Sequence, residues 1–408
     1  MKTPFSTSIM LAVLTTAMYG QNINNTLGST GVFTVKDGST TFLSLNQADG
    51  YLSLTNSLTL AATSGSTIGV IYKGTDRFIH NYGSTNTFVG KNAGNFTMGG
   101  TVAEGISNTG LGEQVLMSLT TGSNNSAVGY AALASNTTGH WNTAVGASAL
   151  AFNTDGAANS AFGHYALRVN TSGQSNSAFG KNALMANTTG PYNSAFGYAS
   201  LASNVTGRDN SAMGYSALFS SVGDSNTAYG YYAGSNITSG SNNTLIGHSA
   251  QPNSGTASNQ ITLGNNAITA LRCNVTTITS LSDARDKKNI RDLPLGLDFL
   301  MSVQPRLFNW DRREWYGTDK ADGSKMQESP TAGFIAQELD ETQTKADAEW
   351  LNLVLKSNPD RLEATPGNLL PIMVKAIQEL KHENNSLKAE LEALKRVVHA
   401  LDSKLAVQ

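Results

Sequence analysis

Cysteine is almost absent from this sequence, and the histidines are not spaced as metal ligands. Cys273 is the only cysteine, which excludes an intrachain disulfide framework and a cysteine-based zinc site. The six histidines show none of the His-x-x-x-His or Glu-x-x-His spacings that indicate a metal site. We therefore predict no metal and no other cofactor.

Charged residues are scarce over most of the chain. They number 17 in residues 1–281 and 39 in residues 282–408. A formal net charge of −2 and the lack of a lysine or arginine cluster before residue 282 argue against nucleic acid as a partner. The shift in composition predicts two regions with different structures.

The apolar run Ile9–Leu14 is much shorter than the about 20 residues of a transmembrane helix. It follows Lys2 and precedes small residues, a pattern typical of a secretory signal peptide over residues 1–20. Cleavage after Ala17 or after Gly20 fits the pattern. We expect a secreted or cell-surface protein without a transmembrane segment after signal removal; a buried amino-terminal helix is the alternative.

Residues 21–81 alternate apolar with Thr, Ser and Gly side chains. Residues 31–35 and 41–45 are typical of short strands. Asp-Gly pairs, as at Asp37, suit hairpin turns because glycine adopts positive φ at little cost. We predict a small β collar here.

From Asn86 the chain is a repeat of Asn-(Ser/Thr)-x-apolar-Gly, usually followed by x-x-Ala-Leu and Asn-x-x-Gly. Most units are 17 residues apart, with one interval of 16 and one of 22. A unit this short suits one coil of a β-solenoid built from two strands and two turns. We therefore predict a solenoid over residues 82–268. The first motif's glycines are Gly90, Gly112, Gly129, Gly146, Gly163, Gly180, Gly197, Gly214, Gly230, Gly247 and Gly264.

Residues at the same position of each coil should stack. We predict an asparagine ladder of Asn125, Asn142, Asn159, Asn176, Asn193 and Asn210, with amides bonded from coil to coil. We expect Val128, Val145, Phe162, Phe179, Phe196 and Met213 to fill the interior. The Ala-Leu pairs provide a repeating core that a disordered segment, the alternative, would lack; their leucines are Leu116, Leu133, Leu150, Leu167, Leu184, Leu201 and Leu218.

This repeat resembles the head of trimeric adhesins of the YadA type, a left-handed parallel β-roll with an Asn-Ser-x-x-x-Gly-like coil. The adhesin unit is usually a few residues shorter. The resemblance implies a homotrimeric rod that presents a binding face to a surface glycan or a protein ligand.

Residues 269–281 are expected to form a neck that leads to a junction at Ser282. Ser282 and Lys287 are five residues apart, and a lysine kept neutral by partial burial can take the proton of a serine hydroxyl. Ser-Asp before a run of charges is also an ordinary helix cap, in which Ser282 or Asp283 accepts backbone N–H bonds. Spacing alone leaves both interpretations open.

The pattern Ser-Asp-x-Arg-x-Lys-x-Asn-Ile from Ser282, the sequence Gly-Phe-Ile-Ala-Gln-Glu-Leu from Gly333 and a carboxyl-terminal heptad helix resemble one known domain. It is the intramolecular chaperone domain of peptidase family S74, and the resemblance extends over residues 282–408. Members occur at the carboxyl end of phage tail fibres, endosialidase tailspikes and bacterial surface fibres; they trimerise, assist folding and then cut themselves off. The resemblance implies that Ser282 is the nucleophile and Lys287 its general base.

Ring size predicts a cut between Leu281 and Ser282. Attack by Ser282 Oγ on the Leu281 carbonyl forms a five-membered ring, whereas attack on its own carbonyl needs a strained four-membered ring. An attack between subunits would relax this restriction. Asp283 is expected to orient or pair with Lys287 or Arg285. Because the nucleophile leaves with its fragment, this is a single-turnover autocatalytic serine peptidase, with no activity predicted on other substrates.

Apolar residues after Pro371 recur at alternating spacings of four and three, which predicts a coiled coil over residues 371–408. A single amphipathic helix packed on its own domain is the alternative. Asn384 is the polar seam residue and should favour one register. The seam is Met373, Ile377, Leu380, Asn384, Leu387, Leu391, Leu394, Val398, Leu401 and Leu405.

The predicted fold is mainly β: a repetitive parallel β-roll or solenoid rod, expected to be trimeric, followed by an α+β chaperone domain that ends in a long coiled-coil helix. The predicted function is an adhesive or structural rod on a cell surface, or alternatively in a virion tail fibre. A glycan-degrading tailspike is the alternative function, and it needs a pair of carboxylates. The acids between Asn86 and Leu281 do not recur at the repeat period; they are Glu104, Glu113, Asp155, Asp209 and Asp224.

Overall fold

The computed structural model describes residues 32–37, 40–46, 52–54, 59–61, 63–66, 68–98, 104–268, 270–272, 282–316 and 320–405. The expected signal peptide, Cys273 and the cleavage residue Leu281 lie outside these ranges. The chain divides into two compact units, one up to Ala62 and one from Thr63.

The first unit contains one small antiparallel sheet in the order β1-β2-β3. Its strands are β1 (Val32–Asp37), β2 (Thr40–Asn46) and β3 (Leu52–Leu54). The strands predicted at 31–35 and 41–45 are therefore confirmed. β1 ends at Asp37, where the Asp-Gly pair predicted a turn.

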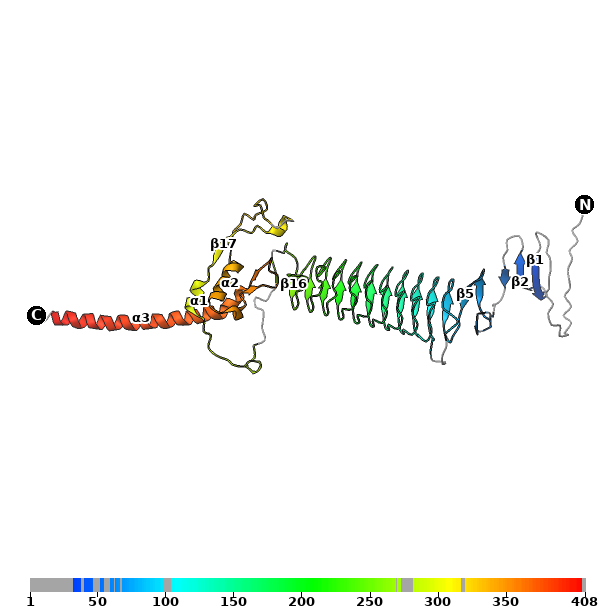
Figure 1. The fold of residues 1–408 in the computed structure, drawn as a ribbon, viewed down its shortest axis with the longest axis horizontal. Helices are drawn as coiled ribbons and strands as arrows, with labels where there is room; N and C mark the ends of the chain where they lie inside the picture. The colour runs from blue at the N-terminus through cyan, green and yellow to red at the C-terminus, as the bar shows by residue number, and fades with distance from the viewer. Residues whose placement is uncertain are drawn as a thin grey trace, which may run out of the picture. The chain divides into compact units, whose positions relative to one another are not determined.

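The second unit begins with a 13-stranded sheet. Strands β4 (Ile71–Lys73) and β5 (Asp76–His80) are antiparallel, and β5 pairs antiparallel with β6. The sheet therefore starts before the repeat, inside the segment expected to form the collar. The strands from β6 onward pair in parallel (Figure 1). They are β6 (Thr87–Val89), β7 (Thr109–Leu111), β8 (Ser126–Val128), β9 (Thr143–Val145), β10 (Ser160–Phe162), β11 (Ser177–Phe179), β12 (Ser194–Phe196), β13 (Ser211–Met213), β14 (Thr227–Tyr229), β15 (Thr244–Ile246) and β16 (Ile261–Leu263).

Parallel pairing confirms the predicted solenoid, but each coil has one three-residue strand instead of two. The Ala-Leu pair turns the chain where a second strand was expected. Its leucines adopt left-handed φ angles, such as 51° at Leu133 and 49° at Leu167. A residue in that conformation cannot continue an extended strand.

The coil interior is lined by asparagine, alanine and leucine. The strand alanines, such as Ala161, and the turn leucines, such as Leu167, are fully buried. The prediction that the residue before each motif glycine fills the interior is wrong. Val128, Val145, Phe162, Phe196 and Met213 are exposed, and Phe179 is half-buried. Successive strand side chains point to opposite faces, so an inward asparagine places the residue three positions later outside.

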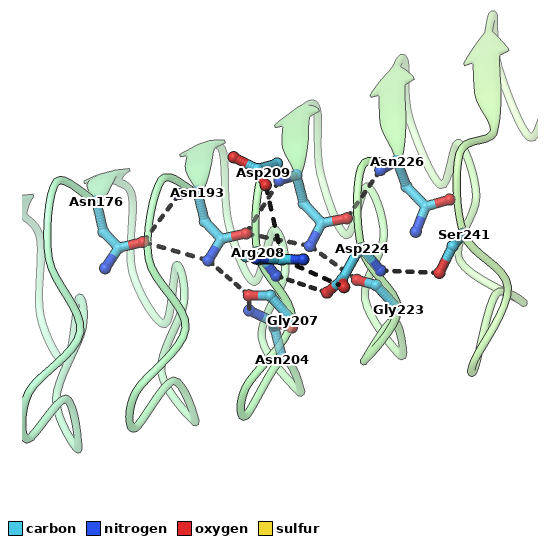
Figure 2. Close-up of polar contacts among 11 residues, drawn as sticks. Asn176, Asn193, Asn204, Gly207, Arg208, Asp209, Gly223, Asp224, Asn226 and Ser241 are labelled. Carbon is cyan, nitrogen blue, oxygen red and sulfur yellow. Dashed lines mark hydrogen bonds and ion pairs between the residues drawn. The ribbon is translucent and has the colours of Figure 1, made fainter.

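The predicted asparagine ladder is confirmed. In each rung the side-chain oxygen accepts both the backbone N–H and the side-chain N–H of the asparagine one coil later. Asn176 Oδ1, for example, accepts from Asn193 N at 2.9 Å and from Asn193 Nδ2 at 3.2 Å (Figure 2). Each amide also donates to a backbone carbonyl, as Asn193 Nδ2 does to Gly207 O at 2.8 Å. These buried polar groups are therefore satisfied by one another.

A second asparagine ladder, which we did not expect from the repeat, runs through its Asn-x-x-Gly part. Side-chain bonds of 2.7–3.1 Å join its successive members, Asn136, Asn153, Asn170, Asn187 and Asn204. It stops at the 16-residue coil, where buried Ser221 occupies the next position. Asn204 Oδ1 consequently has no hydrogen-bond partner.

The motif glycines let neighbouring coils approach closely. Gly163 has φ +140°, and a Cβ atom added there would lie 2.6 Å from Gly180 O of the next coil. The backbone conformation and the contact distance both require glycine.

The carboxyl-terminal domain begins with a 3₁₀ turn, η1 (Ala284–Asp286), followed by α1 (Leu297–Ser302). Strand β17 (Arg306–Phe308) pairs antiparallel with β18 (Thr331–Gly333), which precedes α2 (Ala336–Lys345). The domain thus contains both helices and strands, as expected for the predicted α+β fold. The remaining elements are η2 (Arg313–Trp315), η3 (Glu349–Leu351), the antiparallel pair β19 (Val354–Leu355) and β20 (Glu363–Ala364), η4 (Pro366–Leu369) and α3 (Leu370–Leu405).

Helix α3 is 36 residues long and joins the domain only near its start. Ile372 packs in the domain's core with Phe299 of α1, and the neighbouring Ala376 is also buried. Glu379 Oε2 accepts the Leu297 backbone N–H at 2.6 Å. The predicted seam is not used for this packing, since its apolar residues from Met373 to Leu401 are exposed. Among the described helices, none is long and apolar enough to cross a membrane.

Candidate active site

The 3₁₀ turn η1 brings Ser282 and Lys287 together. The turn lies between the two residues in the chain, and Lys287 Nζ donates a hydrogen bond to Ser282 Oγ. The same ammonium group lies 3.2 Å from the Ser282 backbone oxygen. A nucleophile and its base need this direct contact, because the base must reach the hydroxyl proton.

Asp283, not Ser282, caps the turn. Its Oδ1 accepts the Arg285 backbone N–H at 2.8 Å. Of the two interpretations that the sequence left open, the cap therefore applies to Asp283, and Ser282 remains available to Lys287. Asp283 thus accepts the free backbone N–H of the turn, while the hydroxyl group of Ser282 is hydrogen-bonded to Lys287.

Arg285 is the charged partner of Asp283. Its guanidinium Nη2 lies 2.6 Å from Asp283 Oδ2, and its Nε lies 3.1 Å from both carboxylate oxygens. These side-chain bonds, followed by the Arg285 backbone N–H, hold the pKa of Asp283 below its usual value. The carboxylate that caps the turn therefore stays charged at acidic pH values at which a free aspartate already takes up a proton. Arg285, and not Lys287, neutralises this carboxylate, as one of the two sequence hypotheses expected.

The junction lies on the surface of the single chain. Ser282, Asp283, Arg285 and Lys287 are all exposed. Water therefore has access to the serine and to the lysine. Asn384 lies in α3, and its side chain is exposed as well.

Metal-ligating side chains are not clustered in the ranges that the structure describes. Within those ranges, no group of three or more His, Cys, Asp and Glu side chains is arranged to hold a metal ion.

Comparison with known proteins places this junction at the edge of a recognised domain. No curated protein and no solved structure matches the chain. The match to a family model ends at residue 347, just after α2, so α3 lies beyond it. Residues 282–347 match the peptidase S74 family, described as chaperone of endosialidase, and the matched segment begins at Ser282.

Proposed function

We propose that the chain is a trimeric fibre protein whose carboxyl-terminal domain, residues 282–408, directs assembly and then releases itself by cutting between Leu281 and Ser282. The hydrogen bond between Lys287 Nζ and Ser282 Oγ at the first residue of the matched segment is the observation that carries this proposal. The solenoid is the fibre shaft that remains after the cut.

The proposed reaction starts with transfer of the Ser282 hydroxyl proton to Lys287. Ser282 Oγ then attacks the Leu281 carbonyl carbon, and the peptide C–N bond breaks as the Ser282 nitrogen takes a proton. The product is an ester between Leu281 and Ser282. Water hydrolyses it, which leaves a carboxylate on Leu281 and a free amino group on Ser282.

The proposal requires the junction to be covered before it reacts. A solvated lysine carries a proton at neutral pH, and removal of water favours the neutral amine that a general base must be. Ser282 and Lys287 are exposed in the single chain. We infer that neighbouring chains of the trimer cover them, so that cleavage waits for assembly.

Two unpartnered apolar surfaces support the trimer. One is the exposed seam of α3, whose spacings of four and three match a coiled coil. The other, which we call the outer row, is the exposed or half-buried residue that ends each strand from β7 to β16. Its rings stack along the solenoid, with centroids 4.7 Å apart for Phe162 and Phe179 and 4.8 Å for Phe179 and Phe196. The outer row comprises Leu111, Val128, Val145, Phe162, Phe179, Phe196, Met213, Tyr229, Ile246 and Leu263.

An apolar row with the period of the solenoid fits a second solenoid best. An identical chain that runs parallel offers the same residue at each step, and burying the row would remove apolar surface from water. We assign this row to contacts between the chains of the trimer.

A secreted or surface location is part of the same proposal, and a virion tail fibre is its alternative. The observation behind it is the apolar run after Lys2, which is typical of a signal peptide. Amino-terminal sequencing of the native protein tests it: a mature chain that begins after Ala17 or Gly20 supports export, and an intact Met1 contradicts it.

A glycan-degrading activity is less well supported. Asp209 and Asp224 are brought near each other, but Arg208 Nε lies 3.9 Å from one carboxylate and 3.6 Å from the other (Figure 2). Arg208 N also donates to Asp224 Oδ1 at 3.0 Å. Both carboxylates are ion-paired with the same arginine, whereas the two carboxyl groups of a glycosidase flank the glycosidic bond that is cut. We therefore favour a structural or adhesive fibre.

The cleavage claim is tested by substitution at the junction. Ser282→Ala removes the nucleophile and Lys287→Ala removes the base, so each variant should remain uncut while it assembles normally. Lys288→Ala is the matched control, because it removes the adjacent lysine and should be cut like the wild type. Cutting of Ser282→Ala, or loss of cutting in Lys288→Ala to the same extent as in Lys287→Ala, contradicts the assigned roles.

A further inference from the structure

Two large aromatic side chains project from one corner of the solenoid. Trp141 and Tyr192 each immediately precede an inward asparagine, and they are 64% and 61% exposed. Both adopt left-handed backbone conformations, with φ angles of 57° and 60°. Asparagine and aspartate tolerate this conformation, whereas large aromatic residues adopt it rarely. Neither burial nor backbone preference therefore explains an aromatic residue at this corner.

The same corner carries small or polar residues in the other coils. Ala158 and Ser175 stand between the two aromatic residues, one in each intervening coil, and both are exposed. The two aromatic residues are therefore separated by two coils whose corner side chains are small. The other members of this column are Thr85, Ser107, Asn124, Asp209, Ser225, Asn242 and Asn259.

Backbone hydrogen bonds fix the spacing of the two rings. Ala158 N donates to His140 O at 2.9 Å, Ser175 N donates to Ala157 O at 2.9 Å, and Tyr192 N donates to Gln174 O at 3.0 Å. Three steps of hydrogen-bonded coils at roughly 4.8 Å each place the corners about 14 Å apart. A ligand that spans them meets a preorganised surface, which lowers the entropy lost on binding.

The Trp141 ring is supported from one side. The Ser123 backbone N–H donates to His140 Nδ1 at 3.0 Å, which fixes the imidazole. The His140 and Trp141 ring centroids are 5.6 Å apart. The indole is therefore held in place while most of its surface faces solvent.

We propose that Trp141 and Tyr192 form a binding site for a neutral, hydroxyl-rich oligosaccharide that lies along this corner. One sugar ring stacks its C–H face on each aromatic ring, and the exposed Gln174 and Ser175 hydrogen-bond to hydroxyl groups between them. This site rests on the proposed function of the solenoid as an adhesive fibre, and it specifies the class of ligand that the fibre binds.

The charges near the two rings and the spacing of the rings favour a neutral oligosaccharide over an acidic ligand or a second copy of the chain. Arg208, one coil beyond Tyr192, is already paired with Asp209 and Asp224, so it does not offer an unpaired cation to an acidic ligand. A second copy of the chain would make contacts in every coil, as the outer row does. Only two members of this column are aromatic, which indicates a ligand of limited length.

The test uses the full chain as expressed and an array of neutral, sialylated and sulfated oligosaccharides. Calorimetric titration with the neutral oligosaccharide that binds best then gives the affinity. Trp141→Asn and Tyr192→Asn introduce a residue that already occupies the same corner at Asn124, so the fold should be kept. We expect each variant to lower the affinity about tenfold, the size of one lost contact worth 1.4 kcal/mol, and the double variant to show no measurable binding.

Tyr130→Asn is the control, since Tyr130 is an exposed aromatic residue outside this column; it should bind like the wild type. The proposal is overturned if no neutral oligosaccharide binds, if only sialylated or sulfated glycans bind, or if the double variant retains wild-type affinity. Cleavage at the junction is scored on the same samples. Normal cleavage without glycan binding would contradict the proposed glycan site but not the cleavage mechanism. Glycan binding by an uncut wild-type chain would contradict the cleavage mechanism but not the glycan site.

Discussion

At the residue scale, the buried leucine found in seven of the coils combines a strained backbone with a favourable side chain. Leu133, Leu150 and Leu167 have φ angles of 49–51° and are fully buried. The left-handed conformation costs an L-residue roughly 1–2 kcal/mol, whereas full burial of a leucine side chain contributes about 1.5–3 kcal/mol. Burial therefore outweighs the strain, and one residue both turns the chain and fills the coil.

Substitution of Asn176 tests how much the asparagine ladder contributes to the stability of the solenoid. Asn176→Ala removes the acceptor of the Asn193 backbone N–H and the donor to Gly190 O, which lies 2.9 Å from Asn176 Nδ2. The buried Asn193 backbone N–H would lose its partner, at a cost of about 1–3 kcal/mol, whereas Gly190 O would still accept from Asn187 Nδ2 at 3.0 Å. We expect a lower midpoint of thermal unfolding and faster hydrogen exchange at the Asn193 amide.

Ser177→Ala is the control for this variant, because Ser177 occupies the neighbouring outward position of β11. It should leave the unfolding midpoint nearly unchanged. Equal effects of the two substitutions would show that the ladder contributes no more than an outward hydroxyl.

At the element scale, the repeat period and the parallel stacking could be predicted from the sequence, but the inward face of each strand was assigned wrongly. Asn159 and Phe162 are three residues apart and therefore point to opposite faces of a strand. Hydrophobicity favoured Phe162 for the interior, whereas the structure places Asn159 and Ala161 there. The ladder of paired amides decides the orientation, because a buried asparagine is tolerated only when its hydrogen bonds are made.

The turns were harder to predict than the strands. A leucine with positive φ contradicts its local preference, so the sequence suggested a second strand where the chain turns. At the junction the residue types were informative, since Ser282 and Lys287 do meet. The sequence could not decide which residue of the Ser-Asp pair caps the turn, because both side chains can accept a backbone N–H.

Helix α3 permits a prediction about its polar seam residue. Asn384→Leu should raise the temperature of dissociation and unfolding of the trimer, because a buried asparagine in a seam reduces stability while it selects one register. Sedimentation should show additional oligomeric species in the variant and a single trimer in the wild type. A wild-type carboxyl-terminal fragment that sediments as a monomer at micromolar concentration would contradict the coiled-coil trimer.

At the scale of the whole molecule, assembly and cleavage form one sequence of events in this account. The solenoid coils present the exposed outer row along their length, and apolar surface of this extent favours association with any similar surface. Deletion of residues 282–408 should therefore give aggregated solenoid, because chains without a register-setting partner pair incorrectly and slowly.

Size-exclusion chromatography compares the truncated chain with Ser282→Ala, which keeps the carboxyl-terminal domain attached. We expect the truncated chain in the void volume or in the insoluble fraction, and Ser282→Ala as a soluble trimer. A soluble, folded trimer from the truncated chain would show that the carboxyl-terminal domain is dispensable for assembly.

The most direct measurement for the central claim is the intact mass of the freshly expressed wild-type protein, combined with amino-terminal sequencing of each species. We expect two fragments, one that ends at Leu281 and one that begins with Ser282 at its amino terminus. A single uncut chain, or a cut at any other bond, would contradict self-cleavage at this junction.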